Sequence, residues 1–151
     1  MLSRQLPTLI SMPMFEVGVI TVKEEIQRRI NSLLHQVFES YENGVILASQ
    51  GLCQQYEGIR ARLSKALHTP EDVAEMDRYK NNLLVDMTRL QGEMKDNRQS
   101  VFFLLRADRN LKQETQELVL QLHKWPQQLD EHLDECDEKH IEQRAALEAE
   151  V

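Results

Sequence analysis

Apolar residues recur every three or four positions along most of this chain, which is the spacing of one face of an α-helix. Over residues 23–67 the repeat continues for roughly a dozen turns. We therefore predict one long helix across this range. Its apolar positions are Ile26, Ile30, Leu33, Val37, Tyr41, Val45, Ala48, Leu52, Tyr56, Ile59, Leu63 and Leu67.

The first 22 residues follow a different pattern. Residues 15–22 read FEVGVITV, in which apolar and β-branched residues alternate with others. This alternation predicts one short strand or extended segment. No second strand pattern follows it, so we expect residues 1–22 to be an irregular lead-in that contains this segment. A signal peptide is not favoured, because Pro7 and Pro13 interrupt the apolar stretch.

The clearest boundary in the sequence lies at residues 68–70. Thr69 is a good N-cap, Pro70 fits the first position of a helix, and Asp72 places a carboxylate three residues after the cap. The sequence therefore predicts a turn here that joins two long helices. Helices joined by so short a turn run antiparallel, so residues 23–106 are expected to form a helical hairpin.

The second helix of this hairpin carries a seven-residue repeat, which is typical of coiled-coil packing. One set of heptad positions holds Met76, Leu83, Leu90, Asn97 and Leu104. The other set holds Val73, Lys80, Met87, Met94 and Val101. Lys80 and Asn97 interrupt the apolar pattern. Polar residues at such positions fix the register, or mark a place where the partner helix has departed.

Residues 107–151 are predicted to form a second helical pair. The polar sequence RADRN at 106–110 is expected to break or bend the preceding helix. A helix ending at Trp125 and another beginning at Pro126 are predicted, since the residue before proline avoids helical angles. The expected inward positions are Leu111, Thr115, Leu118, Leu122 and Trp125, then Leu129, Leu133, Cys136 and Ile141.

The composition supports an all-α fold, an elongated bundle of long antiparallel helices. Glycine and proline number five and four, and aromatic residues make up only 5% of the chain, too few for a β-sandwich. Residues 1–70 carry seven basic against six acidic side chains, and residues 71–151 carry eleven against nineteen. Without a basic surface, neither nucleic acid nor an anionic membrane is an expected partner. Two cysteines without a CxxC motif fit a reducing, cytosolic compartment.

No catalytic, nucleotide or cofactor site is predicted. The dispersed glycines do not form a phosphate-binding loop. His132, Cys136 and His140 are spaced four apart, so two of them share a helix face and suit zinc. The alternative, which we favour, is a solvated acidic face with a half-buried cysteine. The glycines at 44, 51 and 58 repeat every seven residues, either by chance, to admit a closely packed neighbour or to let the helix bend.

Three segments together resemble one known family. They are MFEVGVITV before the long helix, HTPEDVAEMDRYK at the start of the next, and LHKWPQQLDEH ahead of the last. Their order is similar to that of dynein heavy chains, in the tail region preceding the linker, and more to axonemal than to cytoplasmic members. The resemblance covers roughly residues 14–151. The family pattern of a capped helix followed by acids and a methionine–acid–aromatic run matches residues 69–79, and its Trp-Pro matches Trp125 and Pro126.

This resemblance implies a non-catalytic spacer that links the anchoring tail to the linker and motor of a microtubule-based ciliary motor. The implied partners are the rest of the heavy chain, other dynein subunits and, indirectly, the axonemal doublet microtubule. The implied location is the cytoplasm and the cytoskeleton of the cilium. Five residues are predicted to matter structurally, namely Thr69, Pro70, Asp72, Trp125 and Pro126. The alternative function is a free-standing coiled-coil adaptor or scaffold that binds partner helices.

Overall fold

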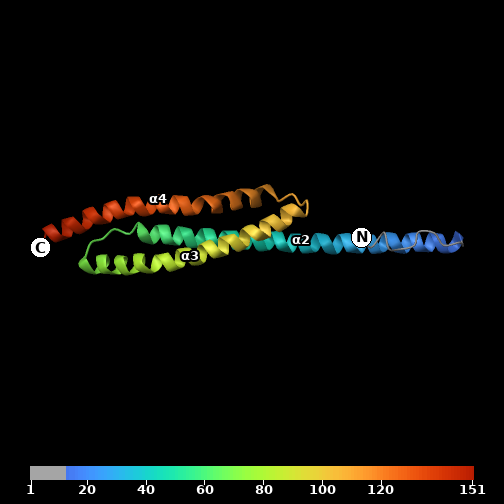
Figure 1. Cartoon of the computed structure of the whole chain (residues 1–151), viewed down its shortest axis with the longest axis horizontal. Helices are drawn as coiled ribbons and strands as arrows, with labels where there is room; N and C mark the ends of the chain where they lie inside the picture. The colour runs from blue at the N-terminus through green and yellow to red at the C-terminus, as the bar shows by residue number, and fades with distance from the viewer. Residues whose placement is uncertain (1–12) are drawn as a thin grey trace. The chain divides into compact units, whose positions relative to one another are not determined.

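The computed structural model describes residues 13–151, with side chains from residue 18 onward. This part of the chain consists of three long helices, α2 (Pro13–Leu63), α3 (Pro70–Arg106) and α4 (Gln113–Ala149), and contains no strand (Figure 1). The predicted all-α fold is confirmed. The chain divides between Tyr41 and Glu42 into two compact units, which are described separately below.

The predicted extended segment at residues 15–22 is wrong, because α2 already begins at Pro13. β-branched residues lower helix stability by only a few tenths of a kcal/mol each, roughly 0.7 at most. Adding residues to an existing helix gains one hydrogen bond per residue, whereas a lone strand has no ladder partner. Helix propagation from residues 23 onward therefore outweighs the local strand preference. The rest of the predicted lead-in, residues 1–12, lies outside the described residues.

The second unit is a three-helix bundle. α2 and α3 are antiparallel, because Ser49 contacts Asn97 while Arg62, further along α2, contacts Glu75. α3 and α4 are also antiparallel, because Arg98 bonds to His123 and Asp77 to Arg144. The chain thus passes along the bundle three times, and the predicted hairpin of α2 and α3 is present with α4 packed against both.

The core of this unit follows the predicted heptads. In α3 the first heptad set is buried at every position, including the polar Asn97. The interruption at Asn97 is explained by the side chain of Ser49, whose hydroxyl accepts a 2.8 Å hydrogen bond from the Asn97 amide. The main apolar cluster comprises Leu52, Cys53, Tyr56, Ile59, Leu63, Leu67, Met76, Leu83, Leu90, Met94, Leu122, Trp125, Leu129 and Cys136.

Hydrogen bonds cap the helix ends at the two connections, from side chains at the start of α3 and from the backbone at its end. Thr69 and Asp72 form a capping box at the start of α3, as the sequence predicted, with Pro70 in the first turn. α3 ends in a Schellman motif: Asp108 adopts a positive φ of 52° and the amide of Arg109 donates to the carbonyl of Leu104. This ends α3 within the RADRN sequence.

α4 begins without a cap from its own first residues. Glu42 of α2 supplies the missing acceptor instead, because its carboxylate accepts from the Lys112 amide and from the Thr115 hydroxyl, both at 2.9 Å. The carboxylate therefore satisfies a free N–H at the positive end of α4. It also fixes α4 against α2 at this end of the bundle.

The predicted division of the last segment at Trp125–Pro126 is wrong, because α4 is continuous through Pro126. A proline inside a helix removes one hydrogen bond and costs about 3 kcal/mol. Leu122, Trp125 and Leu129 on either side are all buried in the same core. Each such side chain contributes roughly 1.5–3 kcal/mol, so keeping them on one continuous helix outweighs the cost of the proline.

One smaller expectation also fails, and one open alternative is decided. Ile141 was predicted to face inward, but it is 69% exposed, and His140 occupies the buried position that follows Cys136 on the same face. A methyl group added at Gly44, Gly51 or Gly58 would meet no atom within 4 Å, so these glycines do not admit a close neighbour. Separately, none of the described helices has an apolar stretch of the length needed to cross a bilayer.

Candidate functional site

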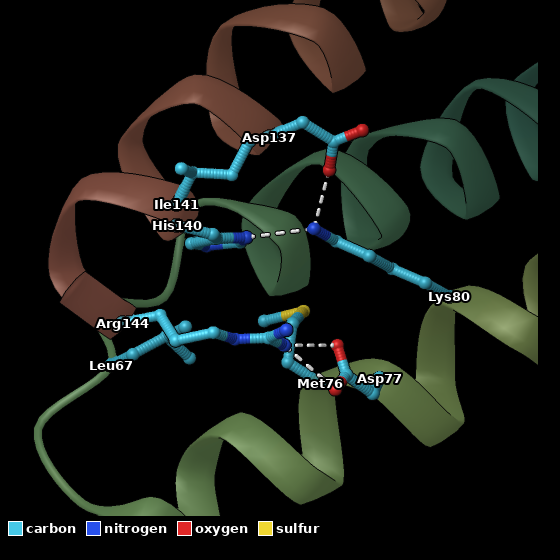
Figure 2. Close-up of a pocket in the computed structure, with 8 residues that line it drawn as sticks. All are labelled: Leu67, Met76, Asp77, Lys80, Asp137, His140, Ile141 and Arg144. Carbon is cyan, nitrogen blue, oxygen red and sulfur yellow. Dashed lines mark hydrogen bonds and ion pairs between the residues drawn. The ribbon is translucent and has the colours of Figure 1, made fainter. Parts of the chain in front are cut away.

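Several charged and polar side chains of the second unit surround a cavity at the end of the bundle where α2 is connected to α3 (Figure 2). Here a cavity of about 220 Å³ is lined by Leu67, Met76, Asp77, Lys80, Asp137, His140, Ile141 and Arg144. We refer to Lys80, Asp137 and His140 as the polar clasp. The Lys80 ammonium bonds to the Asp137 carboxylate and lies 2.9 Å from Nδ1 of His140.

The polar clasp has supporting contacts on both sides. Arg144 forms an ion pair with Asp77, in which Nη2 donates to both carboxylate oxygens at 2.7 and 2.9 Å. Gln143 accepts a 3.0 Å hydrogen bond from the backbone amide of Leu67. α4 is therefore held to α3 by two ion pairs and to the α2–α3 connection by a main-chain contact.

Charge in this cavity is balanced. Two carboxylates, Asp77 and Asp137, face two permanent cations, Lys80 and Arg144. His140 is buried, and burial, followed by the charge of Lys80, lowers its pKa from the ordinary value of 6.5. A site with matched charges and a neutral imidazole has no surplus of either sign, so it does not favour a phosphate or a divalent cation.

A second group of reactive side chains lies between the end of α2 and α4. Ser64 Oγ is 2.7 Å from Nε2 of His132, which is 3.3 Å from the sulfur of Cys136. Glu135 lies 3.9 Å from Nδ1 of the same histidine. The residue types are those of a nucleophile, a base and an orienting acid.

The geometry does not support nucleophilic catalysis at this group. The Ser64 hydroxyl donates to the carbonyl of Arg60 at 2.8 Å, so its oxygen is the acceptor toward His132. In that arrangement Nε2 of His132 carries the proton and cannot receive one from Ser64. Burial raises the pKa of the Cys136 thiol, which disfavours the reactive thiolate.

The two histidines and the cysteine of the predicted zinc alternative are not brought together as a set of three. Cys136 contacts His132, whereas Nδ1 of His140 is turned to the Lys80 ammonium. Among residues 13–151, no cluster of three or more His, Cys, Asp or Glu side chains has the arrangement of a metal site. The surrounding acids at 130, 131, 134, 135, 137 and 138 are exposed, as expected for a solvated acidic face.

Trp125 is at the centre of the bundle rather than at a joint. Its ring is 4% exposed and stacks on Tyr56, with ring centroids 6.0 Å apart and planes 9° from parallel. Its indole N–H has no hydrogen-bond partner. Burial raises the pKa of the neighbouring Cys53 thiol, and the nearby Trp125 indole lowers it by a smaller amount.

In the first unit, the described part of α2 carries large apolar side chains that are exposed, namely Ile20, Val22, Leu33, Leu34 and Val37. At 3.6 residues per turn these positions span an arc of about 160°. That arc is wider than the seam of a two-stranded coiled coil. Within residues 18–41 of this unit, these side chains form an exposed apolar surface.

Sequence reasoning found the residues of the capping box and expected Trp125 to face inward, but it placed Trp125 at a joint and missed the polar clasp. Lys80 was recognised only as an interruption of the heptad. A signal was present, because a lysine at a heptad position requires a carboxylate or another acceptor on the facing helix. Asp137 and His140 were candidates for that role, but their distance from Lys80 in sequence concealed the contact.

Comparisons of the chain with protein-family models, with curated proteins and with solved structures give no match. The function is therefore argued from the residues and their geometry.

Proposed function

We propose that this chain is a non-catalytic segment of a dynein heavy chain tail, of the axonemal type, that joins the anchoring part of the tail to the linker and motor. The observation that carries the proposal is the three-helix bundle with a heptad-packed core. The resemblance to dynein tails at residues 69–79 and 125–126 supports it. In the structure these two segments are the capped start of α3 and the centre of the bundle core.

The proposed mechanism is mechanical. α3 and α4 each contain 37 residues, about 55 Å at 1.5 Å per residue. Each is packed against a neighbouring helix over most of this length, with buried residues from Met76 to Leu104 in α3 and from Thr115 to His140 in α4. Bending such a bundle requires its close-packed core to slide. A displacement at one end of the second unit is thus passed to the other end.

The proposed partners are the rest of the heavy chain or other dynein subunits. Through them the chain would be connected to the doublet microtubule in the cytoskeleton of the cilium.

The decisive test is the natural transcript that encodes this chain. We expect the reading frame to continue after Val151 into a linker and a ring of ATPase modules. A frame that continues into an unrelated domain, or stops, would contradict the proposal.

A second candidate function is favoured by one observation, the exposed apolar side chains of residues 18–37. A free-standing coiled-coil adaptor would use such a surface to bind partner helices. Analytical ultracentrifugation of the 151-residue chain separates the two functions. A well-behaved monomer or dimer with one cooperative melt favours the adaptor, whereas progressive self-association or partial melting favours a segment of a longer helical array.

A further inference from the structure

The polar clasp contains a histidine that has to be neutral. His140 is only 7% exposed, and its Nδ1 atom lies 2.9 Å from the ammonium of Lys80 (Figure 2). An ammonium group has donors and no acceptor, so Nδ1 is the acceptor and carries no proton. The other ring nitrogen therefore holds the proton, which suits the hydrogen bond between His140 and the backbone of Lys65.

This single ring connects three parts of the bundle. It belongs to α4, it accepts from Lys80 of α3, and it is hydrogen-bonded to Lys65 in the connection between α2 and α3. Lys80 of α3 also forms an ion pair with Asp137 of α4. Loss of the contact at Nδ1 would thus loosen α4 from both neighbours at the same place.

A proton added to Nδ1 meets an unfavourable set of charges. α3 presents Lys80 directly, and α4 presents Asp137 and Arg144. Both oxygens of the remaining carboxylate of the cavity, Asp77 of α3, accept hydrogen bonds from Nη2 of Arg144. The α2–α3 connection presents the backbone of Lys65, which favours a charged His140 ring, as Asp137 does. Two cations in contact at a buried position repel strongly, and Asp137 cannot neutralise both.

We propose that Lys80, Asp137 and His140 act as a proton-sensitive clasp, which holds residues 137–149 of α4 on the α2–α3 connection while His140 is neutral and releases them when it is protonated. The proposal does not depend on the chain being part of a motor tail. It assigns to this end of the bundle a conformational response to acidification.

The direction of the pH dependence follows from linkage. Burial and Lys80 lower the pKa of His140 below its ordinary value of 6.5, so above that value the ring is neutral in both folded and unfolded chains. As the pH falls, the unfolded chain takes up the proton first. The contribution of the clasp to stability is therefore lost progressively as the pH falls from about 6.5 through the pKa of the folded state.

The first test needs no substitution. The imidazole resonances of the intact 151-residue chain are titrated by NMR, and amide hydrogen exchange is followed along α4. We expect His140 to titrate below its ordinary value, and residues 137–149 to lose protection over the same pH range. A His140 pKa at or above the ordinary value, or protection in 137–149 that does not change as His140 titrates, overturns the proposal.

The second test uses His140→Gln, because a glutamine amide offers the acceptor and donor of a neutral imidazole and does not titrate in this range. Urea unfolding is compared at about pH 7.5 and about pH 5.5, on either side of the ordinary histidine pKa. The acid-induced rise in the unfolding equilibrium constant should be at least about threefold larger in the wild type than in the variant. An equal rise in both proteins contradicts the proposal.

The matched control is His123→Gln. His123 also lies on α4 and also accepts from a cation, Arg98 at 3.2 Å, but it is exposed, so solvent screens the pair. This variant should keep the pH profile of the wild type. A control profile as flat as that of His140→Gln would show that the acid response does not belong to the clasp, and would overturn the assignment.

Discussion

The two units use the same helix, α2, in opposite ways. In the first unit Leu33 is 61% exposed and Val37 is 52% exposed, although both belong to the apolar repeat. In the second unit Leu52 is 3% exposed and Tyr56 is fully buried at positions of the same repeat. Periodicity therefore identifies which face of a helix is apolar, but burial depends on which other segments pack against that face.

The comparison also separates local from tertiary stabilisation. A single helix gains little from its own apolar side chains, because most of the stability of helices in proteins comes from tertiary packing. In the first unit Arg28 and Arg29 each form an exposed ion pair with Glu25 of the same helix, and pairs of this kind contribute about 0.3–0.5 kcal/mol. In the second unit the packed core dominates. Substitutions should therefore differ sharply in effect between the two.

The largest effect is expected for Trp125→Ala. The stacked ring fills the centre of the core against Tyr56, so its removal leaves a cavity and should lower the free energy of unfolding by about 3–5 kcal/mol. Urea unfolding followed by circular dichroism measures this change, since the variant lacks the only tryptophan of the chain.

The matched control for Trp125 is Leu120→Ala, also on α4 but exposed. That variant should stay within about 0.5 kcal/mol of the wild type. If Trp125→Ala were as stable as Leu120→Ala, the bundle described here would not be the structure in solution.

The next effect concerns the buried hydrogen bond between Asn97 and Ser49. Asn97→Ala leaves the Ser49 hydroxyl buried without its partner, which should cost about 1–3 kcal/mol. The double variant Asn97→Leu with Ser49→Ala removes both polar groups and should recover most of the loss. A double-mutant cycle in urea, completed by the single variants Asn97→Leu and Ser49→Ala, measures the coupling, and additive effects of the two sites would contradict a shared hydrogen bond.

A smaller effect is expected at the start of α3. Thr69→Ala removes the side-chain acceptor for the Asp72 amide and should cost about 1 kcal/mol. Thr88→Ala is the matched control, because Thr88 bonds only within the middle of α3. Equal melting temperatures for the Thr69 variant and the wild type would show that the capping box does not stabilise the bundle.

The capping box also predicts a pH dependence. A hydrogen bond from the His68 amide, opposed only in part by burial, lowers the pKa of Asp72 below its ordinary value of 3.8. The folded state therefore holds the carboxylate charged more firmly than the unfolded state does. This contribution is present above that ordinary value and is lost as the pH falls through the folded pKa. Asp72→Asn should weaken the acid dependence of unfolding in that range, and an unchanged dependence would argue against the assigned contact.

Much of the bundle could be predicted because its signals are local. Thr69, Pro70 and Asp72 satisfy backbone groups within one turn, and the heptad from Met76 to Leu104 requires only helix geometry. The errors arise where distant segments decide the outcome. Pro126 remains inside α4 because the core holds the residues around it, and His140 is buried because α3 supplies Lys80. Neither effect is visible in the neighbouring sequence.

The smallest effect should come from the first unit, where it bears most directly on the comparison. Leu33→Ala removes an exposed leucine and should change the free energy of unfolding by less than about 0.5 kcal/mol. The same substitution at a buried position of α2, Leu52→Ala, should cost about 2–5 kcal/mol. Both are measured by urea unfolding of the whole chain, with Trp125 fluorescence reporting the bundle and circular dichroism reporting all helices. A loss at Leu33 as large as that at Leu52 would mean that the face containing Leu33 is covered in the isolated chain, and the contrast between the two units would then disappear.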